Sequence, residues 1–422
     1  MNSQRSYLLL QGVCSPFFNV LAGHLISRGH QVVKLNFNVG DQLYWRTKAP
    51  SYNWRGKLED LPDFVANIWK RHGITDQILF GDCRPVHKGI IQKARSNGIR
   101  NHVFEEGYLR PYWITLEREG VNANSMLPRN SDWYLRAADY VPRSSSPKHK
   151  IASAFNTRAL HDVAYHLGGA LNPVLFPHYK THAALTAPQE YLGYLWRFAR
   201  LRNCKKRDEE KIKKLLESGR RYFFIPLQLN GDFQVRQHSA FGDMNELMTY
   251  VSETFALHAP KDAMLVFKNH PLDMGITPHA QDVERIIKHY NLENRILYLE
   301  TGNLNQLIHH SEGMITLNST CGHVSLAAKK PTIALANAIY SMPGLTHQGS
   351  LESFWYTPQA PDPKIVDAFR RVLTHTVQVN GGFYTPDGIE LAVRNSVSLL
   401  EAEQSPLEQL LCQIPESLCA LS

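Results

Sequence analysis

Two adjacent carboxylates, Glu105 and Glu106, are the clearest candidates for acid–base chemistry in the sequence. They end a predicted strand and precede Gly107 in the segment FEEGYLRP. Because side chains alternate between the two faces of a strand, only one of these carboxylates can easily face a cleft. A carboxylic acid there could donate a proton to an acceptor hydroxyl or take one from it. Arg110 follows and could pair with a carboxylate of the protein or of a ligand. An ordinary pair of surface acids would give the same pattern.

A third carboxylate, Asp232, stands five residues beyond a predicted strand at residues 222–227, in the segment PLQLNGDFQVRQHS. Gln228, Arg236 and His238 are close to it in sequence. A carboxylate with a base and a cation nearby could act as a nucleophile or stabilise positive charge in a transition state. The Asn-Gly-Asp order also favours a plain turn, and the residue types leave both interpretations open.

Two segments of the second half carry residue types that bind phosphate. The first, KNHP, ends a predicted strand with a cation and an imidazole, and both can bind phosphate oxygens. The second, NSTCGHVS, places small hydroxyl residues where a predicted helix begins, so that backbone N–H groups and the helix dipole favour an anion. The candidates are Lys268, His270, Pro271, Asn318, Ser319 and Thr320. Each segment alone could be an ordinary helix start, but together they favour a phosphate-bearing ligand.

Two loops of the first half also follow predicted strands. QGVCSPFF, residues 11–18, has small residues that let backbone N–H groups approach a substrate, although a plain strand–helix turn is an equal alternative. FGDCRPVH, residues 80–87, places Asp82 and Arg84 just past a strand end. These two residues either line a cleft or form a structural salt bridge.

The elements that must position these residues form two series of alternating strands and helices. Strands are predicted at residues 7–10, 31–35, 77–80 and 102–104, and then at 222–227, 263–268, 295–299, 313–317 and 332–335. Helix-period segments separate them, which predicts parallel sheets with helices on both faces. Open sheets of this kind bind ligands at the carboxyl ends of their strands. We therefore predict an α/β protein of the GT-B-like class, with two Rossmann-like domains facing a central cleft.

Length and charge agree with this architecture. A chain of 422 residues exceeds a typical single core, and we place domains at 1–205 and 206–375, followed by C-terminal helices at 376–422. The net charge of +8 suggests an anionic partner, and we favour a membrane surface plus an anionic substrate over nucleic acid. The stretch 190–202 interleaves apolar and basic residues, so it could lie on a membrane or pack between domains.

Several function classes are excluded. The sequence has no DxD motif, no GxxxxGK[ST] loop, no HExxH and no GxSxG, which argues against P-loop NTPases, zincins and common esterases. No apolar run is long enough to span a bilayer or to form a signal-peptide core, and the cysteines lack zinc-ligand spacing. We expect a cytoplasmic protein with free, buried thiols.

In their order along the chain, QGVCSPFF, FGDCRPVH, FEEGYLRP, PLQLNGDFQVRQHS, KNHP and NSTCGHVSLAAKKP resemble the capsule polysaccharide β-Kdo transferases. The type is the one that starts the poly-Kdo linker on a lipid, Kdo being 3-deoxy-octulosonic acid. The resemblance covers about residues 11–331. Each motif is weak alone, and their order gives the resemblance its specificity. Val13 and Cys14 stand where a Gly/Pro-rich turn is expected, which leaves the role of that loop in acceptor binding open.

The resemblance implies a retaining, metal-independent transferase without a cofactor. Its donor is CMP-β-Kdo, bound by the second domain, and its acceptor is a phosphatidylglycerol-class lipid at the inner face of the cytoplasmic membrane. Asp232 takes the role of nucleophile, and Glu105 or Glu106 that of acid/base. His270 with Lys268, and Ser319 with Thr320, hold the CMP phosphate, and Gln228, Pro271 and Asn318 belong to the same donor site. Peripheral membrane contact and contact with other capsule enzymes are further expectations.

Two other functions remain as alternatives. A CDP-alcohol phosphotransferase of the teichoic-acid polymerase kind is also lipid-directed, but it has no need of a carboxylate nucleophile. A non-catalytic accessory protein of capsule export would keep the fold without chemistry. The converging acids and phosphate-binding segments argue against the second.

Overall fold

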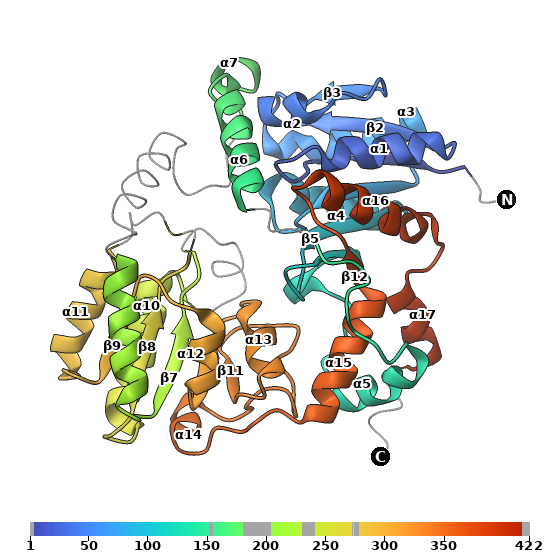
Figure 1. Cartoon of the computed structure of the whole chain (residues 1–422). Helices are drawn as coiled ribbons and strands as arrows, with labels where there is room; N and C mark the ends of the chain where they lie inside the picture. Colours follow the sequence, from blue (N-terminus) through green and yellow to red (C-terminus); the bar gives the residue numbers. More distant parts are fainter. Residues whose placement is uncertain are drawn as a thin grey trace. The chain divides into compact units, whose positions relative to one another are not determined.

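The computed structural model of the chain describes residues 4–151, 155–179, 204–229, 241–271, 273 and 278–415. They form two compact units (Figure 1). As far as each range is described, unit 1 takes in Met1–Pro128, Arg136–His182 and Arg370–Ser422, and unit 2 takes in Arg129–Leu135 and Ala183–Phe369. Helices α5 (Ser131–Ala137) and α15 (Pro363–Thr376) continue from one unit into the other.

Unit 1 is built on a seven-stranded sheet in the order β12-β6-β5-β4-β1-β2-β3. Its strands are β1 (Ser6–Leu9), β2 (Gln31–Asn36), β3 (Ser51–Asn53), β4 (Asp76–Phe80), β5 (Arg100–Glu106), β6 (Trp113–Arg118) and β12 (Gln378–Asn380). The five strands from β3 to β5 are parallel, and the order reverses on the two sides of β1. The switch point, at which such sheets bind ligands, therefore lies at the carboxyl ends of the adjacent strands β1 and β4.

Helices cover both faces of this sheet. They are α1 (Phe17–Ser27), α2 (Val39–Tyr44), α3 (Leu61–His72), α4 (Pro85–Ser96), α6 (Phe155–Gly169), α7 (Asn172–Leu175), α16 (Pro386–Glu401) and α17 (Pro406–Gln413). Alternate residues of β1 show the two layers: Tyr7 and Leu9 enter a core with α1 and α16, whereas Leu8 and Leu10 enter a core with α3 and α4. Burial on both faces explains why β1 is a continuous apolar run.

Unit 2 has a five-stranded, fully parallel sheet in the order β11-β10-β7-β8-β9. The strands are β7 (Tyr222–Pro226), β8 (Met264–Lys268), β9 (Ile296–Leu299), β10 (Gly313–Thr316) and β11 (Thr332–Ala334). Its helices include α10 (Met244–His258), α11 (His279–Tyr290), α12 (Leu304–His310), α13 (Cys321–Ala327) and α14 (Leu351–Tyr356). The order reverses between β7 and β10, which gives unit 2 its own switch point.

The prediction of two Rossmann-like α/β domains is confirmed, and each predicted strand is present to within one or two residues at its ends. The prediction that the chain after residue 375 is helical is wrong for Gln378–Asn380, because these residues form β12. This strand pairs antiparallel with β6, and α16 packs against α1, so the C-terminal segment is part of unit 1. A three-residue strand is too short to show a period of two. Strands β3 and β6 were also missed.

None of the described helices is long and apolar enough to cross a membrane. The five cysteines in the described residues are free thiols, as expected, but the expectation that they are buried is wrong for Cys412, which is exposed, and Cys83 is the one of the five that is fully buried.

At the amino ends of the unit 1 strands, a buried carboxylate ties the sheet to the C-terminal segment. Asp76 is fully buried and accepts from Arg5 at 3.2 Å, from Arg100 at 2.8 Å and contacts the His102 ring at 2.8 Å. Burial alone would raise the pKa of this carboxyl, but its bonds to His102 and Arg100 hold the pKa well below the usual range. Both arginines also reach Glu403, beyond α16.

We expect Asp76→Asn to lower the free energy of unfolding by about 3–5 kcal/mol, because it leaves two guanidinium groups without their shared carboxylate. Urea titration followed by circular dichroism measures the change. Asp63→Asn removes the charge of the exposed partner of Lys93 and serves as the control, with a much smaller expected change because solvent screens this pair. Equal effects of the two substitutions would contradict a structural role for the Asp76 cluster.

Candidate functional site

The switch point of unit 1 is bridged by Arg84. This residue precedes α4 and follows β4, and its Nη1 donates to Gln11 Oε1 at 3.1 Å and to the Gly12 carbonyl at 2.8 Å. Its guanidinium also lies 5.0 Å from the centre of the Phe80 ring. The loops after β1 and β4, both singled out in the sequence, are therefore fastened to each other by one side chain.

Glu105, at the end of β5, lies next to this bridge. A Cβ atom added to Gly81 would stand 3.3 Å from Glu105 Oε2 and 3.6 Å from Arg84 Nε, so the three residues are close together. Burial, with a further contribution from the Glu106 charge, raises the pKa of Glu105 to about 7, although the Glu106 N–H donates to it and Arg84 is near. A carboxyl with this pKa can either give up or accept a proton near neutral pH.

Glu106 occupies a different environment, as the alternation along a strand requires. It accepts from the Tyr384 hydroxyl at 3.0 Å and forms an ion pair with Arg158 at 3.2 Å. Arg158 in turn lies 5.0 Å from the centre of the Tyr384 ring. Sequence alone could not separate the two glutamates. Their partners do, because Glu106 is held in place by a cation and a hydroxyl.

The other two candidates of unit 1 have local partners. Asp82 is buried and accepts from the Val121 N–H at 3.1 Å and from Asn124 Nδ2 at 2.9 Å, so it fixes the turn after β6. Arg110 is exposed, and its Nε donates to the Gly107 carbonyl at 3.3 Å. Of the four residues, Arg84 and Glu105 lie close together at the switch point. The contacts of Asp82 and Arg110 are with nearby loop residues and support a structural role for both.

A hydrogen-bond network joins the switch point to α6. The Tyr165 hydroxyl accepts from Gln11 Nε2 at 3.3 Å and from Asn38 Nδ2 at 2.7 Å, and it donates to Asp41 at 3.0 Å. Asp41 also accepts from the Phe37 N–H at 2.9 Å. Burial raises the pKa of Tyr165 well above its ordinary value, so the hydroxyl keeps its proton.

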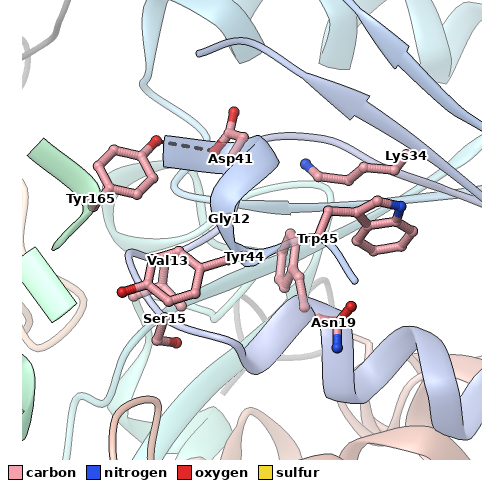
Figure 2. Close-up of a pocket in the computed structure, with 10 residues that line it drawn as sticks. Gly12, Val13, Ser15, Asn19, Lys34, Asp41, Tyr44, Trp45 and Tyr165 are labelled. Carbon is pink, nitrogen blue, oxygen red and sulfur yellow. Dashed lines mark hydrogen bonds between the residues drawn. The ribbon is translucent and has the colours of Figure 1, made fainter. Parts of the chain in front are cut away.

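Beside this network lies a pocket that the sequence indicated only in part, through the loop at residues 11–18, while its other lining residues were missed (Figure 2). It encloses about 280 Å³, including its open mouth, and mixes aromatic rings with polar groups. Its lining residues are Gly12, Val13, Ser15, Phe18, Asn19, Lys34, Asp41, Tyr44, Trp45 and Tyr165. Rings together with hydroxyl, carboxylate and ammonium groups suit a small polyol or sugar.

Lys34 is the buried cation of this pocket. Its Nζ donates to the carbonyls of Leu10 at 2.6 Å and Leu35 at 2.9 Å, and burial lowers its pKa to about 8. The sequence feature that could have indicated this site is a lysine between the apolar residues Val33 and Leu35 of a predicted strand, because lysine is seldom fully buried unless it is paired.

In unit 2 the predicted phosphate-binding residues gather at the carboxyl edge of one sheet. Gln228, after β7, donates to Asn318, after β10, at 3.2 Å, so the switch point is bridged as in unit 1. Lys268 ends β8 and is buried, with its Nζ 3.1 Å from the Asn269 carbonyl. His270, two residues after Lys268, is half-buried and precedes Pro271.

The segment before α13 is held close to its neighbours. Ser319 Oγ accepts from the Cys321 N–H at 3.2 Å, and the Ser319 carbonyl accepts from the Tyr340 hydroxyl at 2.6 Å. Thr320 is the N-cap residue of α13, immediately before its first residue, Cys321. A Cβ on Gly322 would come within 2.2 Å of the Tyr340 ring, which explains the glycine.

Three predicted residues, Asp232, Arg236 and His238, lie outside the described residues, as does the stretch 190–202. Within the described ranges, no group of three or more His, Cys, Asp or Glu side chains could hold a metal ion.

Comparisons with known proteins agree with the motif order. Residues 75–384 match the family described as "Capsule polysaccharide biosynthesis protein". The chain is 35% identical over 394 residues to the capsule polysaccharide modification protein LipB of Neisseria meningitidis serogroup B, covering 91% of this chain and 93% of LipB. It is 35% identical over 384 residues to the capsule polysaccharide export protein KpsS of Escherichia coli, covering 90% of this chain and 97% of KpsS. Among solved structures it is similar to the β-Kdo 2,7 transferase of Thermosulfurimonas dismutans KpsC, with 13% identity, coverage of 93% and 99%, and a TM-score of 0.44.

The cysteines of the site loops provide a direct check on this geometry. Burial, with the nearby Asp162 charge, raises the pKa of Cys14 to about 12, and burial with Asp82 does the same for Cys83. At pH 8 the reactive thiolate is then roughly one part in ten thousand. We expect iodoacetamide to label the exposed Cys412 and to spare both loop cysteines until urea is added, as followed by peptide mass spectrometry. Rapid labelling of Cys14 in the folded protein would contradict the described packing of this loop.

Proposed function

The chain belongs to the capsule polysaccharide biosynthesis protein family, and on this premise we propose that it is a retaining β-Kdo glycosyltransferase. In this proposal it moves Kdo from CMP-β-Kdo to a phosphatidylglycerol-type lipid at the inner face of the cytoplasmic membrane. The product starts the linker of a capsular polysaccharide. The reaction uses no metal and no cofactor.

The observation that carries the proposal is the environment of Glu105. It is a half-buried carboxyl with a pKa of about 7, located at the carboxyl edge of the parallel sheet beside the switch point. An acid/base catalyst works best when its pKa is near the working pH. We assign the acid/base role to Glu105 and a positioning role to Glu106, which is paired with Arg158 and Tyr384.

The donor is assigned to unit 2. Lys268 and His270 supply a cation and an imidazole for the phosphate of CMP, and Ser319 and Thr320 add hydroxyl groups. Gln228 and Asn318 already meet across the switch point of this sheet, where a nucleotide is expected. The pocket beside Lys34 in unit 1 has the size and polarity for the hydroxyl-rich head of the acceptor.

A double displacement accounts for retention of configuration. In the first step the Asp232 carboxylate bonds to C2 of Kdo, while the bond from C2 to the phosphate oxygen breaks and CMP leaves with the electron pair. In the second step an acceptor hydroxyl attacks C2, its proton goes to Glu105, and the bond to Asp232 breaks. Both steps pass through an oxocarbenium-like state that a nearby carboxylate stabilises.

The decisive experiment incubates the purified protein with CMP-Kdo and a fluorescent phosphatidylglycerol analogue and detects products by mass spectrometry. We expect a Kdo adduct with the unaltered protein and none with Asp232→Ala. Glu105→Gln should lower kcat by about 10²–10⁴-fold, the usual worth of a general base. Glu106→Gln is the matched control and should stay within roughly tenfold.

Other outcomes would contradict either the assigned residue roles or the transferase proposal itself. Product from Asp232→Ala removes that residue from its role, and a larger loss with Glu106→Gln than with Glu105→Gln reverses the assignment of the glutamates. If no adduct forms while CMP-Kdo remains intact, the transferase proposal fails. Turnover of a CDP-alcohol would then favour the phosphotransferase alternative.

The pH dependence supplies an independent test. As the base of the second step, Glu105 must be ionised, so the rate of transfer should rise through pH about 7. The Arg84 charge lowers the pKa of Glu105 and the Glu106 charge raises it. Arg84→Met should therefore move the midpoint of the pH–rate profile to higher pH, and Glu106→Gln should move it to lower pH. Shifts of the same sign in both variants would rule out Glu105 as the titrating group.

A further inference from the structure

Helix α6 and the short helix α7 carry an apolar stripe on their outer side. Leu160, Leu167, Leu171 and Val174 are 68%, 64%, 56% and 79% exposed. Leu160 and Leu167, seven residues apart, lie along one side of α6, and Leu171 and Val174 follow in the turn after α6 and in α7. Soluble proteins seldom leave neighbouring aliphatic side chains this exposed, and larger patches of this kind mark interaction surfaces.

The inner side of the same helix is polar, and its contacts fix the orientation. Arg158 pairs with Glu106 at 3.2 Å, the Tyr44 hydroxyl lies 2.8 Å from His161 Nδ1, and the Tyr165 hydroxyl donates to Asp41. After α6, Asn172 Oδ1 accepts from the Val39 N–H at 2.9 Å. The helix is thus inverted relative to an ordinary surface helix: its polar side is used by the site, and its apolar side is left outside.

The segment that adjoins this helix is basic and aromatic. Helix α2 packs against α6, and the two helices lie beside one another in Figure 1. From residue 42 to residue 57 the sequence contains no Asp or Glu, and its four basic residues, Arg46, Lys48, Arg55 and Lys57, are all exposed. Tyr44, Trp45, Tyr52 and Trp54 are half-buried beneath them: Tyr44 and Trp45 line the pocket, and Tyr52 and Trp54 pack on a core of unit 1. The basic residues are therefore the outward-facing groups of this segment, and such residues are attracted to the surface of an anionic bilayer.

We propose that the α6–α7 stripe is the surface by which unit 1 docks on an anionic lipid bilayer, with the 42–57 segment facing the lipid headgroups. This inference rests on the proposed function, because an enzyme with a lipid acceptor must bring its site to the membrane surface. The helix that carries the stripe also supplies Tyr165 to the pocket wall. Docking through this helix therefore brings the pocket close to the headgroup layer. Negatively charged headgroups complement the basic segment, which selects a membrane over an apolar protein partner.

The test compares binding to vesicles with activity on an acceptor that needs no membrane. The double variant Leu167→Asp/Leu171→Asp places charges on exposed positions and should leave the fold intact, as circular dichroism verifies. Leu257→Asp, at a leucine that is 71% exposed on α10 of unit 2, is the matched control. Sedimentation with vesicles of phosphatidylglycerol and phosphatidylethanolamine measures binding, and phosphatidylcholine vesicles report the requirement for anionic lipid.

We expect the double variant to partition at least tenfold less onto anionic vesicles, with Leu257→Asp unchanged and with binding weakened by added salt. Transfer of Kdo to a water-soluble short-chain phosphatidylglycerol should be within twofold of the unaltered protein. The proposal is overturned if the unaltered protein does not bind anionic vesicles or if the double variant binds as well as the control. It is also overturned if the substitutions only convert a dimer to a monomer in size-exclusion chromatography. Loss of vesicle binding in a protein that transfers no Kdo at all would keep the docking surface and refute the proposed function.

Discussion

The Arg84 guanidinium holds together the loops on which the unit 1 site is built. Parallel strands deliver their carboxyl ends to one edge of a sheet, but the loops that follow diverge unless something joins them. Arg84 joins the loop after β1 to the loop after β4 through Gln11 and Gly12, and it lies beside Glu105 at the end of β5. Gln11 continues the connection to Tyr165 and so to Asp41. The positions of α2 and α6 thus depend on the same chain of contacts.

The switch points of the two units are bridged by different side chains. In unit 2 the switch point between β7 and β10 is bridged by the amides of Gln228 and Asn318, where unit 1 uses a guanidinium. In both units a cation next to the switch point donates to a backbone carbonyl oxygen: Arg84 to Gly12 in unit 1 and Lys268 to Asn269 in unit 2.

The polar side of α6 has a consequence for the protein surface. Arg158 and Tyr165 face inward, where Arg158 pairs with the half-buried Glu106 and the Tyr165 hydroxyl donates to the buried Asp41. Because these contacts fix which side of α6 faces the site, Leu160 and Leu167 on its opposite side face outward. The exposed leucines therefore follow from the same contacts that build the site.

The sequence alone determined the pattern of strands and helices, since apolar runs separated by helical periods are local features. It also determined the chemical types at the strand ends and the family. It could not detect β3 or β12, because their sequences, Ser-Tyr-Asn and Gln-Val-Asn, contain no apolar run, and it gave no sign that Gln378–Asn380 would return to pair with β6. It could not distinguish Glu105 from Glu106, because their difference lies in Arg84, Arg158 and Tyr384, which are distant in the chain. The pocket with Lys34 and the outward turn of α6 were likewise decided only by tertiary structure, because burial and pKa depend on which segments meet in space.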